Sequence, residues 1–223
     1  MFIINDAQDK AIFFDSTFLP LIVAIQGKVP TVEKFICYGA RDEKVIAALP
    51  DVIFYDDLIQ NQSAEFNWPQ FGEETPSSLC YTSGTTGNPK GVLYSHRSTL
   101  LHTMAISLPD SLNLSANDVV MPVVPMFHVN AWGVPYAAAM VGSSVVLPGP
   151  NLDGDSLVDL IDNYKVTVAL GVPTIWQGLL AAAKKRGTTL ESMNSNIVGG
   201  AACPPSIIRD FKNNYACDTI HAW

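Results

Sequence analysis

Between Asp118 and Asp153 the chain contains no Asp, Glu, Lys or Arg, and this stretch constrains the fold strongly. It is long enough to span a bilayer as a helix. Prolines, glycines and polar side chains interrupt it, however, so a single unbroken helix does not fit. The interrupting residues are Pro122, Pro125, His128, Asn130, Gly133, Pro135, Gly142, Ser143, Ser144 and Pro148. The stretch therefore predicts a buried strand, helix and strand in a domain interior, and no transmembrane segment.

The rest of the chain alternates short apolar runs with amphipathic segments, which is typical of βα units. We expect an α/β fold in which helices flank a doubly wound, mostly parallel sheet. The expected strands are Ala11–Phe14, Phe35–Tyr38, Ser78–Thr82, Val119–Val124, Ser144–Leu147, Val166–Leu170, Asn196–Val198 and Thr219–His221. The expected helices are Ser95–Ser107, Ala131–Val141, Asp155–Tyr164, Thr174–Arg186 and Pro205–Asn214, and residues 57–77 are predicted to be a linker-like segment.

Composition and net charge limit the kinds of molecule that the chain is expected to bind. The 223 residues suffice for one large or two small domains. A formal net charge of -8 argues against a nucleic-acid partner, because binding a phosphate backbone draws on surplus Lys and Arg. The four cysteines form no C-x-x-C pair, and Cys203 is expected to be a buried, inert thiol. The first ten residues carry no basic segment followed by an apolar one, so we expect a cytoplasmic protein.

A turn suited to polyphosphate follows the third expected strand. Its sequence is Tyr81-Thr-Ser-Gly-Thr-Thr-Gly-Asn-Pro-Lys-Gly91. Its glycines let main-chain N–H groups approach an anion without a Cβ in the way, its hydroxyls add donors, and Lys90 adds a mobile positive charge. The spacing is not that of G-x-x-x-x-G-K-[ST], because Pro89 precedes Lys90 and Gly91 follows it, and the dinucleotide fingerprint G-x-G-x-x-G does not occur.

Residue for residue, this turn resembles the phosphate-binding loop of the acyl-adenylate-forming (AMP-binding) superfamily, which includes acyl-CoA synthetases, luciferases and nonribosomal adenylation domains. The alternative is a polar surface turn with a solvated lysine. The resemblance implies catalytic roles for Thr82 and Lys90, and it makes Thr82 the contact to Mg2+. It also implies that the phosphates of ATP are held by Thr82, Ser83, Gly84, Thr85, Thr86, Gly87 and Lys90.

The segment Met126-Phe-His-Val-Asn-Ala-Trp132 resembles a second marker of the superfamily, in the form typical of medium- and long-chain fatty acyl-CoA synthetases. By itself, a lone His among apolar residues is more often a hydrogen-bonded core residue. The resemblance instead implies that the catalytic His128 lies beside the carboxylate and the nucleotide. It further implies that Trp132 gates the acyl tunnel and that Val129 also contacts the substrate.

Two later segments carry the same resemblance. Gly199-Gly-Ala-Ala-Cys203 is similar to the family's turn beside the adenine and the acyl group, which assigns Gly199, Gly200 and Ala201 to the substrate and Gly200 also to the nucleotide. A tight βα turn would need the same small residues. Ile220-His-Ala-Trp223 resembles the start of the adenine-binding motif, so that His221 and Ala222 would line the base and Trp223 would stack on it.

The loop, the His128 segment and these two segments each follow an expected strand. The carboxyl ends of parallel strands meet at one edge of a sheet, so we expect all four to converge on one crevice. His96 and His102, on the helix after the loop, are assigned no role.

The resemblance implies a fatty acid-CoA ligase. In this family a carboxylate attacks the α-phosphorus of ATP to give acyl-AMP, and coenzyme A then displaces AMP. The chain resembles only part of the N-terminal domain of an acyl-CoA synthetase: the first strands, the Thr and Glu after the adenine-stacking aromatic, and the small C-terminal domain with its lysine have no counterpart in it. We therefore expect this chain by itself to be weak or inactive.

Several alternatives stay open at this point. A short thioether acid, a medium-chain acid and a long-chain acid are all compatible with the His128 segment, and a homodimer is also compatible with the sequence. A non-catalytic nucleotide-binding module, or a truncated gene product, would keep the loop without turnover. A phosphotransferase ranks last, because the chain has neither a Walker lysine nor a kinase-like Asp–Asn loop.

Overall fold

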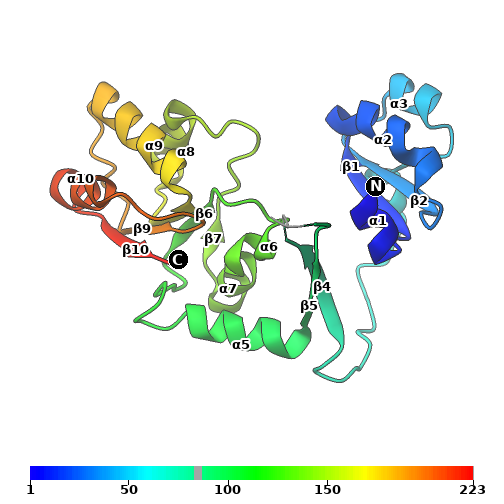
Figure 1. Cartoon of the computed structure of the whole chain (residues 1–223), viewed down its shortest axis with the longest axis horizontal. Helices are drawn as coiled ribbons and strands as arrows, with labels where there is room; N and C mark the ends of the chain where they lie inside the picture. Colours follow the sequence, from blue (N-terminus) through cyan, green and yellow to red (C-terminus); the bar gives the residue numbers. More distant parts are fainter. Residues whose placement is uncertain (83–86, 223) are drawn as a thin grey trace. The chain divides into compact units, whose positions relative to one another are not determined.

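The computed structural model describes residues 1–82 and 87–222 and has the expected α/β architecture with parallel sheets (Figure 1). The chain divides into two compact units. The first comprises residues 1–72 and 81–92, and the second comprises residues 73–80 and 93–223. The strands that were expected to share one sheet are therefore divided between separate sheets.

The first unit contains a parallel sheet in the order β1-β2-β3. Phe14 and Cys37 on the strands pack with Ile22 and Val45 on the helices to form its core. Its elements are α1 (Phe2–Ala7), β1 (Ala11–Asp15), η1 (Ser16–Phe18), α2 (Leu19–Ile25), η2 (Gln26–Lys28), β2 (Lys34–Tyr38), α3 (Glu43–Ala48), β3 (Ile53–Phe54) and α4 (Tyr55–Ile59).

The second unit is built on a parallel sheet in the order β10-β9-β8-β6-β7. Its elements are α5 (His96–Ile106), β6 (Val119–Pro122), α6 (Val129–Trp132), α7 (Val134–Val141), β7 (Ser144–Val145), α8 (Gly154–Tyr164), β8 (Val168–Gly171), α9 (Pro173–Arg186), β9 (Ser195–Val198), α10 (Pro205–Tyr215) and β10 (Asp218–His221). Strands β4 (Pro76–Tyr81) and β5 (Gly91–Ser95) pair with each other, and most of their residues belong to this unit.

Both faces of the sheet in the second unit are covered. Successive side chains of a strand point to opposite faces, so each strand contributes to two cores. Ala169 and Val198 join the cluster that α8, α9 and α10 cover, whereas Leu170 and Ile197 join the cluster on the side of α5 and α7 (Figure 1). This arrangement explains why the strands read as continuous apolar runs.

Helix α9 has the apolar face that its sequence predicts. Trp176 and Leu179 are fully buried in the core, and Ile175 and Leu180 pack against it. The Trp176 indole N–H donates a 3.1 Å hydrogen bond to the Gly171 carbonyl, which satisfies the polar atom of this buried side chain.

The charge-free stretch folds as a strand, helices and a strand, as expected, but its helical part begins later than predicted. The right-handed helix α7 starts at Val134, not at Ala131, because Gly133 takes a left-handed conformation (φ 76°) and breaks the path. The preceding turn α6 is left-handed throughout its length. No helix in residues 1–82 or 87–222 has both the length and the apolar content needed to cross a bilayer.

Candidate active site

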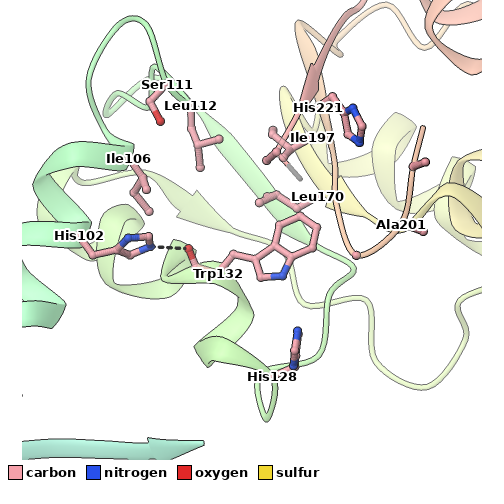
Figure 2. Close-up of a pocket in the computed structure, with 13 residues that line it drawn as sticks. His102, Ile106, Ser111, Leu112, His128, Trp132, Leu170, Ile197, Ala201 and His221 are labelled. Atoms are coloured by element: carbon pink, nitrogen blue, oxygen red, sulfur yellow. Dashed lines mark hydrogen bonds between the residues drawn. The ribbon is translucent and has the colours of Figure 1, made fainter. Parts of the chain in front are cut away.

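A cavity of about 770 Å³ lies in the second unit, at the carboxyl ends of β8, β9 and β10 (Figure 2). Three of the four segments that were expected to converge contribute to it: the His128 segment, the turn after β9 and the end of β10. Its lining residues are His102, Ile106, Ser111, Leu112, His128, Trp132, Leu170, Ile197, Gly200, Ala201, Ala202, His221 and Ala222. The prediction of a shared crevice is thus confirmed for these segments.

The cavity has an apolar wall and a polar rim. Leu170 and Ile197 line it from the sheet face that α5 and α7 cover, and Leu112 adds a further buried side chain. The side chains of His128 and His221 lie at the rim and are exposed to solvent. Such a cavity can bury an apolar group while polar atoms at its mouth contact a more polar one.

The turn after β9 leaves space for the Trp132 ring. A Cβ placed on Gly199 would come within 2.6 Å of Trp132 Cη2 and 2.9 Å of Cζ2, so glycine is required for the ring to lie there. The next residue, Gly200, has φ +76°, a conformation that other residues adopt only with strain. Close packing therefore explains Gly199, and backbone conformation explains Gly200.

The backbone that carries Trp132 is unusual. Val129, Asn130, Ala131 and Trp132 have φ values of 49°, 52°, 51° and 57°, and Gly133 follows at 76°. A left-handed helical conformation costs about 1–2 kcal/mol per L-residue, and the β-branched Val129 is especially ill suited to it. Strain of this kind persists only where neighbouring groups impose it, and it concentrates at functional sites.

Side-chain hydrogen bonds join this left-handed turn to residues outside it. The Asn130 amide donates to Ser78 Oγ at 2.9 Å and accepts from Cys80 Sγ at 3.3 Å. On the other side, His102 Nε2 lies 3.1 Å from the Trp132 carbonyl oxygen (Figure 2). A carbonyl oxygen only accepts, so Nε2 carries the proton in this contact.

The phosphate-type loop belongs to the first unit, and its position relative to the cavity stays a prediction. The Thr82 N–H donates to the Lys90 carbonyl at 3.0 Å, and the Lys90 N–H donates to Thr82 Oγ1 at 3.4 Å, so the two ends of the loop are paired. Gly87 has φ +124°, which favours glycine strongly. Among the assigned site residues, Ser83, Gly84, Thr85, Thr86 and Trp223 lie outside the described residues.

A tyrosine hydroxyl anchors the start of this loop. Tyr81 donates to Asp6 Oδ2 at 2.7 Å, within the same unit. This hydrogen bond, together with desolvation and the nearby carboxylates of Asp6 and Asp9, raises the pKa of Tyr81 to about 12.

Comparison with known proteins identifies the family. A model of the family described as "AMP-binding enzyme" matches residues 1–223. The chain belongs to the AMP-binding enzyme family.

The chain is similar to two curated proteins that are named as CoA ligases. It is 59% identical over 223 residues to a 3-methylmercaptopropionyl-CoA ligase of Ruegeria pomeroyi, and 54% identical over 222 residues to a medium-chain-fatty-acid–CoA ligase of Ectopseudomonas oleovorans. Each match covers 100% of this chain but only 41% of the relative, so the chain spans less than half the length of these relatives.

A solved structure gives the same fold. The anthranilate CoA ligase AuaEII, crystallised with anthranoyl-AMP, superposes with a TM-score of 0.84 at 24% identity, covering 98% of this chain and 41% of that one. At this identity the likeness supports the AMP-binding fold alone.

The structure brings several predicted site residues of this AMP-binding chain together in one cavity, and their roles stay predictions. His128, Trp132, Gly200, Ala201, His221 and Ala222 line the main cavity, whereas Val129 lines a neighbouring one of about 160 Å³. His102, which was assigned no role, lines both cavities. No sequence signal marked it, because its partner is a main-chain carbonyl positioned by the left-handed turn.

Cys203 was expected to be a buried, inert thiol, and the expected full burial is wrong. Cys203 is half-buried, and this burial raises the pKa of its thiol. At neutral pH the nucleophilic thiolate is therefore disfavoured further.

Proposed function

We propose that this chain carries the acid- and nucleotide-binding part of an ATP-dependent acid–thiol ligase. In the complete protein a carboxylic acid is activated to acyl-AMP and then transferred to coenzyme A. The observation that carries the proposal is the cavity at the carboxyl ends of β8, β9 and β10, which joins an apolar wall to the His128 and His221 rim. The family membership supports the same chemistry.

The roles of the residues follow from the charges involved. In-line attack of a carboxylate on a phosphate brings two anions together, so catalysis depends on positioning and on screening of their repulsion. Lys90, with the hydroxyls and N–H groups of residues 82–87, supplies the positive field around the phosphates. His128 orients the carboxylate, and Trp132 bounds the space for the acyl group.

The Thr82 hydroxyl fits the type of oxygen ligand that Mg2+ prefers. Mg2+ in nucleotide sites is usually bound by one or two carboxylates together with phosphate oxygens and water, so Thr82 would supply one oxygen ligand beside the phosphates of ATP. When bound, the ion would neutralise phosphate charge. The paired loop ends at Thr82 and Lys90 would hold that hydroxyl in place.

We propose a fatty or similarly apolar acid as the substrate. The two relatives named above act, by their names, on 3-methylmercaptopropionate and on medium-chain fatty acids. A short thioether acid is therefore the main alternative to a medium-chain acid. Both are apolar beyond the carboxylate and suit a wall built from Leu112, Leu170 and Ile197.

ATP–pyrophosphate exchange with a panel of acids tests the proposal, together with equilibrium binding of ATP. For the 223-residue chain we expect ATP binding with weak or absent exchange. Lys90→Ala should weaken ATP binding, whereas Lys28→Ala, which removes an equal charge outside the loop, should not. Failure to bind ATP would contradict the assignment of the loop, and robust acid-dependent exchange would contradict the expected inactivity.

A further inference from the structure

We propose that His102 and Asn130 are positioning residues that hold the turn Val129–Gly133 in its left-handed form and thereby fix the Trp132 indole against Gly199. Because Trp132 borders the cavity, the two residues would help to determine which acyl groups the cavity accepts. This inference rests on the proposed function for its effect on ligands. Its structural part, the placement of Trp132, does not depend on that function.

The hydrogen bonds within the turn do not explain its left-handed conformation. Its own hydrogen bonds run from Ala131 N–H to the His128 carbonyl and from Gly133 N–H to the Asn130 carbonyl, both at 3.1 Å. These bonds can form equally in a right-handed turn of lower energy. The left-handed form therefore needs contacts between the turn and residues outside 128–133.

The Asn130 side chain makes the first of these contacts. Its side-chain amide bridges Ser78 and Cys80 on β4, at 2.9 and 3.3 Å. Asparagine tolerates the left-handed conformation better than most residues, and here its amide uses both a donor and an acceptor. Two hydrogen bonds therefore connect β4 to the middle of the turn.

His102, on α5, makes the second contact. Its Nε2 donates to the Trp132 carbonyl, and its ring lies against Gly133, where a Cβ would come within 2.6 Å of His102 Cδ2. The ring therefore fills the space that only a glycine leaves open. The turn is held at its middle by Asn130 and at its end by His102.

The consequence for the cavity follows from the position of the indole. Trp132 Cη2 and Cζ2 occupy the space beside Gly199, and Leu170 and Ile197 lie on the same side of the sheet (Figure 2). If the turn relaxed toward a right-handed form, the Trp132 Cα–Cβ direction would change and the ring would leave this position. The shape of the acyl space would then change without any change in the residues that touch the acyl group.

The test uses the 223-residue chain labelled with 5-fluorotryptophan and observed by fluorine NMR. The four tryptophan signals are assigned from Trp→Phe variants, and Trp176, buried in the core on the other side of the sheet, reports on overall folding. His102→Ala and Asn130→Gly should shift or broaden the Trp132 signal while leaving that of Trp176 unchanged. His102→Gln keeps an amide N–H donor and should retain the Trp132 signal.

The choice of Asn130→Gly separates the side chain from the backbone, because glycine permits the left-handed conformation while losing the contacts to β4. Ser78→Ala removes one of those contacts from the opposite side. A Trp132 signal that stays unchanged in His102→Ala and Asn130→Gly would overturn the inference. Equal movement of the Trp132 and Trp176 signals would overturn it too, since it would indicate a general structural role.

The effect on ligands is measured with acyl-sulfamoyl adenosines of increasing acyl length. In the unsubstituted chain we expect a preferred length, and in His102→Ala the ratio of dissociation constants between preferred and disfavoured analogues should fall by roughly tenfold. His102→Gln should restore it. An unchanged ratio alongside a displaced Trp132 would overturn the role in selectivity. If no analogue binds the unsubstituted chain, the proposed function and the selectivity role both fail, and the NMR result still decides the placement of Trp132.

Discussion

At the scale of single residues, Gly199 tolerates little change. A methyl group there would meet Trp132 Cη2 at 2.6 Å, and the backbone of Gly199 has no positive φ to add a separate strain. We expect Gly199→Ala to lower the free energy of unfolding by about 1–3 kcal/mol, as overpacking does, when measured by urea denaturation.

A second substitution, at Trp132, serves as the control for this clash. Trp132→Phe removes the outer ring atoms that the new methyl group would meet, so the double variant should be more stable than the sum of the two single effects predicts. A coupling of about 0.5–3 kcal/mol is usual for residues in contact. Strictly additive effects would show that the ring does not occupy this space.

Tyr81 gives a prediction about pH. Its pKa is raised to about 12 by its hydrogen bond to Asp6. A phenol with a raised pKa in the folded protein contributes stability below its unfolded pKa near 10, and that contribution is lost as the pH rises from about 10 to 12. Asp6→Ala should return the titration of Tyr81 toward 10, as followed by ultraviolet difference spectra against Tyr81→Phe.

If Asp6→Ala leaves the Tyr81 titration near 12, the hydrogen bond is not its cause. The remaining tyrosines should titrate alike in both proteins and serve as the internal reference.

His128 and His102 show which site residues can be predicted from the sequence and which cannot. His128 is recognisable because it lies within a contiguous motif, whereas His102 acts on a main-chain carbonyl of a residue thirty positions away. That contact exists only because residues 129–133 turn left-handed, and Asn130 and Gly133 are the only residue types in the segment that adopt such a turn readily. A pattern of side chains in the sequence therefore cannot predict a hydrogen bond whose acceptor is a main-chain carbonyl.

At the scale of elements, replacing either of two glycines on the packed helices α8 and α9 by alanine should change the free energy of unfolding in opposite directions. A Cβ on Gly154 would clash with the Gly178 carbonyl oxygen, whereas a Cβ on Gly178 would meet its nearest atom, Gly154 N, at 4.0 Å. Gly154→Ala should destabilise by about 1–3 kcal/mol, because backbone must move. Gly178→Ala should stabilise by about 0.5–1 kcal/mol, because it removes a glycine from a helix interior.

Thermal or urea unfolding of the two variants, beside the unsubstituted chain, checks the pair. Each is the matched control of the other, since both replace glycine by alanine at the same contact. The same sign of change in both variants would contradict the packing of α8 on α9.

The elements of the second unit were largely predictable from periodicity, whereas helices α1 to α4 and strand β3 of the first unit were not predicted. Helices α8, α9 and α10 begin and end within a few residues of their expected bounds, because their apolar faces repeat at helical spacing and Asp153, Pro173 and Pro205 mark their starts. The joint between α6 and α7 was missed, because apolar residues continue through it. Strand β5 was also missed, since it directly follows the loop.

At the scale of the whole molecule, the class of fold was predictable but the division into sheets was not. Apolar runs identify strands, and they do not reveal which strand pairs with which. β1 pairs with β2 in one parallel sheet and β8 pairs with β9 in another, and the two sheets have separate cores. The order β10-β9-β8-β6-β7 depends on crossovers that periodicity leaves undetermined.

The carboxyl ends of β8, β9 and β10 place an apolar wall beside a polar rim, and we hold that this cavity receives an acyl group joined to a nucleotide. The direct test is calorimetric titration of the 223-residue chain with a medium-chain acyl-sulfamoyl adenosine and with the same sulfamoyl adenosine lacking the acyl group. We expect the acylated compound to bind at least about tenfold more tightly, because the wall buries its chain. Equal affinity of the two compounds would contradict the assignment of the cavity.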